Sequence, residues 1–87
     1  MNVQKNIQFS RHIKTAGSLK EFNFRNQRGI PESVYLIDVS DERGNRHSFS
    51  MQLIDGSWNI REKSVADWIR AAVPELHAAI EHLEALI

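Results

Sequence analysis

Residues 64–87 read SVADWIRAAVPELHAAIEHLEALI, and the spacing of the apolar residues in this stretch predicts one long amphipathic helix. At 100° per residue, the apolar side chains fall within an arc of about 140°, and the charged residues and both histidines of the stretch lie outside it. The arc consists of Val65, Trp68, Ile69, Ala72, Val73, Leu76, Ala79, Ile80, Leu83, Leu86 and Ile87. A helix with such a face needs an apolar surface to pack against.

Two positions bear on where this helix begins and whether it is continuous. Ser64 is a good N-cap residue, and Asp67 three residues later favours the positive end of the helix dipole, so we predict a start at Ser64. Pro74 removes the hydrogen bond to the carbonyl of Arg70, but the apolar arc keeps its phase across the proline, which favours one kinked helix. The alternative is two helices, with Pro74 as the first residue of the second and Glu75 in its first turn.

The N-terminal part of the chain predicts a β-hairpin. Two stretches between residues 6 and 25 alternate apolar and polar side chains, which is the period of a half-buried strand. With a four-residue loop between them, Phe9 pairs with Phe24 and Arg11 pairs with Phe22. Arg11 would then lay its stem over the Phe22 ring and keep its guanidinium in water.

The middle of the chain predicts two more hairpins. Residues 34–40 form the strongest β run, and residues 41–45 suit a type I turn that ends with Gly44 in the left-handed region. The dipeptide Asp55-Gly56 favours a two-residue type I′ turn. The resulting register places Ile37 opposite Phe49, Tyr35 opposite Met51, Leu53 opposite Trp58 and Met51 opposite Ile60, with Val39 on the same apolar face.

These elements predict the fold class. We expect one α+β domain over residues 1–87, an antiparallel meander of about five strands with the Pro-kinked C-terminal helix packed on its apolar face. A hydrophobic content of 41% and a charged content of 25% are typical of a soluble globular domain.

Composition also narrows the expected environment. No apolar run approaches the ~20 residues that span a bilayer, and the first ten residues lack the apolar core of a secretory signal. The sequence contains no cysteine, which excludes disulfides, thiolate metal sites and thiol catalysis. We therefore expect a cytoplasmic protein that does not contact membranes.

Charge is unevenly distributed in a chain whose formal net charge is zero. Residues 1–33 carry six Lys or Arg and two Glu, whereas residues 64–87 carry one Arg and four Asp or Glu. Basic side chains interleaved with Phe9, Phe22 and Phe24 resemble the surfaces that bind single-stranded nucleic acid. The candidate binding residues are Arg11, Lys14, Lys20, Arg25 and Arg28.

The side chains that could carry chemistry do not form a catalytic or metal-binding pattern. His77 and Glu81 have the i,i+4 spacing of two metal ligands, but no third ligand accompanies them, so a solvated polar pair is the simpler interpretation. His47 is predicted to lie in register with Val39 near a turn and to make a local hydrogen bond. We therefore predict no catalytic residues, no metal site and no cofactor.

Three apolar residues fall on the otherwise polar face of the predicted sheet. Val34, Leu36 and Ile54 would form a small exposed patch at one end of the sheet, through which two copies of the chain could associate. An edge strand offers another route to a homodimer. The alternative is that the N-terminal segment or the loop at residues 26–33 covers the patch.

The sequence thus favours a non-enzymatic binding or protein-interaction module, with a protein partner or a second copy of the chain as its ligand. Binding of single-stranded nucleic acid or RNA through the basic N-terminal strands is the alternative function. A third possibility is a small-molecule pocket between helix and sheet near Trp58 and Trp68.

Overall fold

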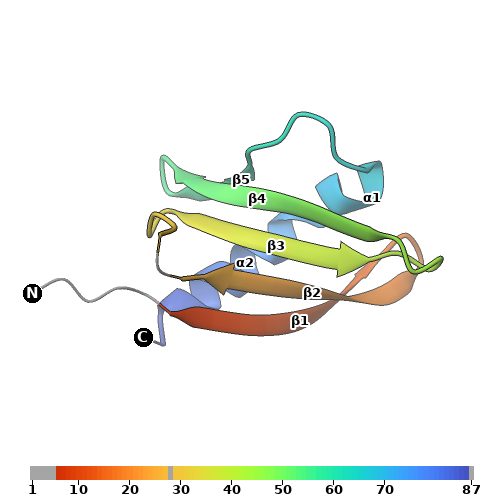
Figure 1. The fold of residues 1–87 in the computed structure, drawn as a ribbon, viewed down its shortest axis with the longest axis horizontal. Helices are drawn as coiled ribbons and strands as arrows, with labels where there is room; N and C mark the ends of the chain where they lie inside the picture. The colour runs from red at the N-terminus through yellow and green to blue at the C-terminus, as the bar shows by residue number, and fades with distance from the viewer. Residues whose placement is uncertain (1–5, 28, 87) are drawn as a thin grey trace, which may run out of the picture.

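The fold is an antiparallel sheet with two helices on one face. The computed structural model describes residues 6–27 and 29–86 of the 87-residue chain. The elements are β1 (Ile7–Thr15), β2 (Ser18–Asn26), β3 (Val34–Ser40), β4 (Arg46–Ile54), β5 (Ser57–Ile60), α1 (Asp67–Arg70) and α2 (Val73–Glu84). The strands form one sheet in the order β1-β2-β3-β4-β5, and α2 lies behind it in Figure 1. The predicted α+β class and the five-stranded antiparallel meander are confirmed.

Turn chemistry sets the strand register as the sequence predicted. Asp55 and Gly56 both have positive φ, 51° and 82°, as a type I′ turn requires. Gly44 has a φ of 83°, and its N–H donates to the Asp41 carbonyl at 3.0 Å. All the predicted pairs are present: Phe9 with Phe24, Arg11 with Phe22, Ile37 with Phe49, Tyr35 with Met51, Leu53 with Trp58 and Met51 with Ile60.

The first turn is tighter than predicted. Thr15 pairs with Ser18, so the loop contains only Ala16 and Gly17 instead of four residues, although the register is unchanged. Ala16 has a φ of 52°, a conformation that alanine adopts rarely. A tertiary contact accompanies this turn, since the Thr15 hydroxyl donates to the Trp68 carbonyl at 2.6 Å.

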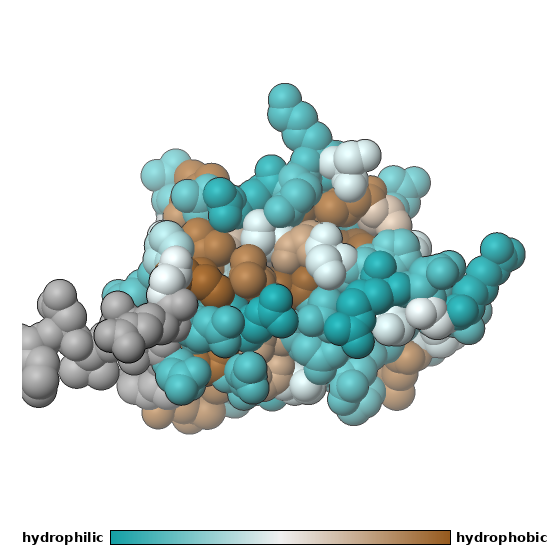
Figure 2. Space-filling model, viewed as in Figure 1, coloured by the Kyte–Doolittle hydropathy of each residue, from teal (hydrophilic) through white to brown (hydrophobic). Residues whose placement is uncertain are grey.

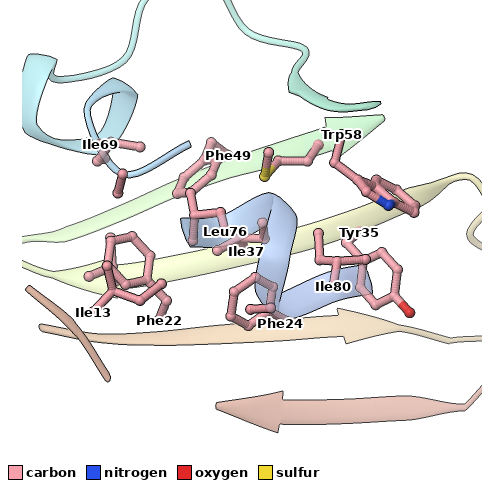
Figure 3. Packing of buried hydrophobic residues seen from close by; sticks show 14 residues of the cluster. Ile13, Phe22, Phe24, Tyr35, Ile37, Phe49, Trp58, Ile69, Leu76 and Ile80 are labelled. Carbon is pink, nitrogen blue, oxygen red and sulfur yellow. The ribbon is translucent and has the colours of Figure 1, made fainter. Parts of the chain in front are cut away.

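The core lies between the sheet and the helices (Figure 3). We call the covered side of the sheet the inner face and the opposite side the outer face. Aromatic rings make close contacts across the strands, with 4.4 Å between the stacked rings of Phe9 and Phe24 and 5.2 Å between the edge-on rings of Tyr35 and Trp58. The buried cluster contains Ile13, Phe22, Phe24, Tyr35, Ile37, Val39, Phe49, Met51, Trp58, Ile69, Ala72, Leu76, Ala79 and Ile80.

The predicted helix start at Ser64 is wrong. α1 begins at Asp67, and the residue before it, Ala66, makes no side-chain capping bond. Val65 and Ala66 instead pack against the core cluster. Burial of these two side chains therefore takes precedence over capping by Ser64.

The predicted single kinked helix is also wrong, and the alternative of two helices is what the structure contains. α1 ends at Arg70 and α2 begins at Val73, with Pro74 in its first turn, where its missing N–H breaks no helical bond. The apolar arc is not buried along its whole length, because Leu86 beyond α2 is 70% exposed. No helix among the described residues has the length and apolarity to cross a membrane.

The corrected helix start can be tested with Ser64→Ala. Because Ser64 does not cap α1, we expect the free energy of unfolding in urea to fall by less than about 0.5 kcal/mol. Leu76→Ala, at a fully buried position of α2, serves as the destabilising control and should cost about 2–5 kcal/mol. A loss of about 1 kcal/mol for Ser64→Ala is the value of a serine N-cap and would place the helix start back at Ser64.

Candidate binding surface

The outermost strands, β1 and β5, form the two edges of the sheet. The geometry of the turns determines which of their backbone N–H and C=O groups have no partner in a neighbouring strand. The pair that closes a two-residue hairpin exchanges both of its hydrogen bonds, and bonded and unbonded pairs then alternate along the ladder. In β1 the closing residue is Thr15, so the odd-numbered residues bond to β2. The N–H and C=O groups of the even-numbered residues point away from the sheet.

The β1 edge is open over four consecutive outward positions. These are Gln8, Ser10, His12 and Lys14, and no described residue accepts a hydrogen bond from any of their N–H groups. We call the row of outward backbone groups at these four residues the β1 edge. One of its carbonyl groups, that of Ser10, accepts from the guanidinium of Arg11 at 3.4 Å.

The opposite edge is shorter and is interrupted by side chains. β5 has four residues, and the outward N–H of Trp58 donates to Nδ1 of His77 in α2 at 3.0 Å. Where β5 ends, the N–H of Ser50 in β4 donates to the Glu62 carboxylate at 2.9 Å, and the Ser50 hydroxyl donates to the same carboxylate at 2.7 Å. The outward N–H groups of Ile60, Ser48 and Arg46 have no described acceptor, but the bonded groups of Trp58 and Ser50 interrupt this row, so no more than two of the open groups are neighbours.

The Glu62 contact has an electrostatic signature. Partial burial pushes the pKa of this carboxyl up, but the N–H and hydroxyl donors of Ser50 outweigh burial and lower the pKa below its ordinary value of 4.5. Glu62 is therefore held as a carboxylate that replaces the missing backbone acceptor beyond the end of β5.

Arg11 is the one charged side chain of β1 on the inner face. It pairs with Phe22 as predicted, and its guanidinium carbon is 5.4 Å from the centroid of the Phe9 ring, two residues away on the same strand, a contact that the sequence did not predict. Phe9 and Arg11 are both half-buried, because β1 has no strand beyond it. Inward-facing charges are typical of edge strands, so Arg11 was the sequence signal for the β1 edge.

A shallow hollow lies on the outer face beside the β1 edge. It has a volume of about 280 Å³ and is lined by residues of β1, β2 and β3. The side chain of Asn23 connects these strands, since its Oδ1 accepts from the Ser10 hydroxyl at 2.7 Å and its Nδ2 donates to the Asp38 carboxylate at 3.1 Å. Arg25 and Asp38 also line a neighbouring hollow of about 220 Å³ over β3 and β4. Figure 2 shows this uncovered face, with hydrophobic side chains near its centre and hydrophilic ones around them.

The predicted basic residues do not gather on one surface. Lys14 and Arg25 are exposed on the outer face, but Lys14 pairs with Leu19, six residues from Arg25, which separates the two by about 20 Å. Lys20 points to the inner face with 7% exposure. Arg11 lies on the inner face as described above, and Arg28 lies outside the described residues.

The contacts of Lys20 lie within the fold. Its ammonium group donates to the Thr15 carbonyl and the Ser18 hydroxyl, both at 2.8 Å, and lies 5.2 Å from the centroid of the Trp68 ring. Glu42 lies 3.8 Å away. This lysine joins the first turn to α1 and is not available to a ligand.

The predicted apolar patch is only partly exposed. Val34 is 4% exposed and Leu36 is half-buried, whereas Ile54 is 50% exposed. The loop before β3 runs beside the patch, since the Val34 N–H donates to the Pro31 carbonyl and the Leu53 N–H donates to the Ser33 carbonyl. Self-association through this patch stays a prediction.

The histidines take part in local contacts. His77 accepts from Trp58 as described and lies 3.3 Å from Glu81, at the i,i+4 spacing noted in the sequence. Nε2 of His47 lies 3.0 Å from Asp41, which matches the predicted local hydrogen bond. Within residues 6–27 and 29–86 no three His, Asp or Glu side chains are grouped to hold a metal ion.

The two tryptophans have different surroundings. Trp58 is buried in the core, edge-on to Tyr35. Trp68 is half-buried and lies edge-on to His47, with 5.1 Å between the ring centroids. A shallow hollow of about 270 Å³ beside Trp68 is lined by Ala16, Lys20, Asp41, Glu42 and Arg43.

Burial is accompanied by hydrogen bonding throughout the part of the chain described. No buried side-chain nitrogen or oxygen there lacks a hydrogen-bond partner. Tyr35 is an example, because its hydroxyl donates to Glu84 at 2.7 Å, and burial together with that carboxylate raises the pKa of the phenol above its ordinary value. The unpaired groups that could recognise a partner are thus backbone groups at the sheet edge and exposed side chains.

Comparison with known protein families, with curated proteins and with solved structures finds no match to this chain.

The turn between β3 and β4 predicts an acid-dependent loss of stability. The hydrogen bond with His47, together with the N–H groups of Asn45 and Arg43, lowers the pKa of Asp41 from 3.8 to about 2. A depressed pKa contributes stability above pH 3.8 that is lost as the pH falls towards about 2. We expect Asp41→Asn to reduce the fall in unfolding free energy between these pH values, measured by urea unfolding.

The same pH series on Asp55→Asn, a turn carboxylate at the other end of β4, serves as the control. An unchanged acid dependence in Asp41→Asn would contradict this assignment.

Proposed function

We propose that this chain is a non-enzymatic protein-interaction module that binds an extended segment of a partner along the β1 edge. In this mode of recognition the partner adds a strand to the sheet, and main-chain hydrogen bonds supply much of the affinity. The observation that carries the proposal is the difference between the two edges, one interrupted by His77 and Glu62 and the other open at four consecutive positions.

The side chains of β1 support the same interpretation. Ile7 and Phe9 pack against the core but are only half-buried, because they lie on the outermost strand. An added strand would cover their remaining apolar surface at about 25 cal/mol per Å². Each new backbone hydrogen bond would contribute about 1 kcal/mol, so a short segment would bind with moderate affinity.

The other functions considered from the sequence receive less support. Binding of single-stranded nucleic acid needs a continuous basic surface, whereas Lys14 and Arg25 lie about 20 Å apart along the strands and Lys20 is buried. A homodimer through Ile54 and Leu36 would have a small apolar contact. A cytoplasmic location remains part of the proposal, supported by the absence of cysteine.

The proposal is tested by selecting linear peptides from a random library on the immobilised chain and measuring their affinity for two variants. His12→Pro removes an outward N–H without breaking the bonds to β2, and we expect it to weaken the selected peptides at least about tenfold. His12→Thr keeps the N–H and favours a strand, so it should bind the peptides as the unchanged chain does. Circular dichroism and urea unfolding check that both variants fold.

Equal binding of the selected peptides to His12→Pro and to the unchanged chain would overturn strand addition at β1. Turnover of a small-molecule substrate, abolished by a single side-chain change, would overturn the non-enzymatic proposal.

A further inference from the structure

The cations of β1 have no carboxylate partner among the described residues. The described contacts of Arg11 are the Ser10 carbonyl and the Phe9 ring. Lys14 is exposed and makes no described ion pair, and β1 itself contains no acidic residue. The one described ion pair of β1 joins His12 to Glu21 of β2, 3.8 Å apart on the outer face, and involves neither Arg11 nor Lys14.

Arg11 determines which strands can be added at the β1 edge. Directly opposed side chains on neighbouring antiparallel strands have Cβ atoms about 4.5–5.5 Å apart, so the residue opposite Arg11 would meet its guanidinium. An apolar residue there would remove water from the charge without giving it a partner, which costs free energy. Arg11 therefore disfavours apolar strands in general, which is how inward-facing charges protect edges from aggregation.

From this arrangement we infer that the partner of the β1 edge is an acidic extended segment with a carboxylate opposite Arg11. The inference deepens the proposed function and rests on it. A carboxylate on the inner face can bind the guanidinium with two parallel hydrogen bonds and so give Arg11 the acidic partner that it lacks. Specificity then follows from one side chain that rejects apolar strands and accepts acidic ones.

The register of β1 specifies a sequence pattern for this segment. In an antiparallel partner, the residue three positions before the acid that meets Arg11 lies opposite Lys14, on the outer face. The residue two positions before it lies opposite Ile13, and the residue two positions after it lies opposite Phe9. The expected segment therefore reads acid, apolar, any, acid, any, apolar, with a further apolar residue two positions later, opposite Ile7.

A second copy of this chain is a poorer occupant. Antiparallel pairing of two β1 strands would place Arg11 opposite either another Arg11 or an uncharged residue, because β1 contains no acid. Like charges directly opposite each other are destabilising, and an apolar residue there would leave the charge without a partner. Charge complementarity thus favours an acidic partner over self-association at this edge.

The test uses a synthetic peptide with blocked ends, Glu-Val-Thr-Glu-Thr-Val-Thr-Ile, and measures its affinity for the full chain by fluorescence anisotropy. Replacing the second Glu of the peptide with Gln should weaken binding at least about tenfold. Arg11→Glu should weaken the acidic peptide by a similar factor and should prefer a peptide with Lys at that position. Arg11→Gln, which is neutral and close in length, should bind the Glu and Gln peptides equally and covers the case in which Arg11→Glu does not fold.

The matched control is Arg46→Glu, which makes the same charge change on an exposed residue of β4, three strands from β1. Equal weakening by Arg11→Glu and Arg46→Glu would mean general electrostatic attraction and would overturn the inference. Equal binding of the Glu and Gln peptides to the unchanged chain would overturn it too.

The same experiment separates strand addition at the β1 edge from the preference for an acidic partner. Loss of all peptide binding in His12→Pro, without any charge preference at Arg11, would leave strand addition standing and remove the acidic partner. Sedimentation of the chain alone over roughly 1 µM to 1 mM should give a monomer. A dimer in which Ser10→Cys cross-links to itself, undisturbed by the acidic peptide, would replace that partner with a second copy.

Discussion

Backbone hydrogen bonding at the edges of an open sheet is the constraint on which this structure depends. A meander of five strands satisfies the backbone groups inside the sheet and leaves a row of them on each outer strand. On the β5 side, the side chains of His77 and Glu62 accept hydrogen bonds from two of these outward N–H groups. On the β1 side, no described side chain accepts from an outward N–H group, although β1 is more than twice as long as β5.

The position of α2 on the inner face explains why an outward N–H group of β5 has an acceptor and those of β1 have none among the described residues. α2 lies across the back of the sheet, and its residues Leu76, Ala79 and Ile80 complete the buried core. The same helix brings His77 to the N–H of Trp58, so one element both buries apolar surface and occupies an edge donor. β1 receives packing on its inner face but no comparable bond along its outward backbone. Ile7 and Phe9 are half-exposed because no described strand lies beyond β1.

Local chemistry in the sequence was sufficient to predict the sheet. Asp55-Gly56 and Gly44 fix two turns because few residues tolerate positive φ, and the alternation of apolar side chains then fixes the register. The helices were predicted less well. Ser64 has the chemistry of a cap, but the segment after it is drawn into the core by Val65 and Ala66, a tertiary effect that no local pattern contains.

The candidate site was harder to predict than the fold. Which strands form the edges depends on the order of the strands in the sheet, which the apolar periodicity of the sequence does not contain. The bond from Ser50 to Glu62 joins residues twelve apart, beyond the end of β5, and no periodic pattern predicts it either. Grouping Arg11, Lys14, Lys20 and Arg25 by sequence proximity did not account for strand alternation, which places them on opposite faces. Only Arg11, an inward charge within an apolar pattern, carried local information about the β1 edge.

Hydrogen exchange of the backbone amides, measured by NMR on a dilute sample, tests the central claim most directly. We expect alternation along β1, with slow exchange at Phe9, Arg11 and Ile13 and fast exchange at Ser10 and His12, while Trp58 on the opposite edge exchanges slowly. Equal protection of neighbouring amides along β1, or fast exchange at Trp58, would contradict the claim that side chains interrupt one edge of this sheet and leave the other open.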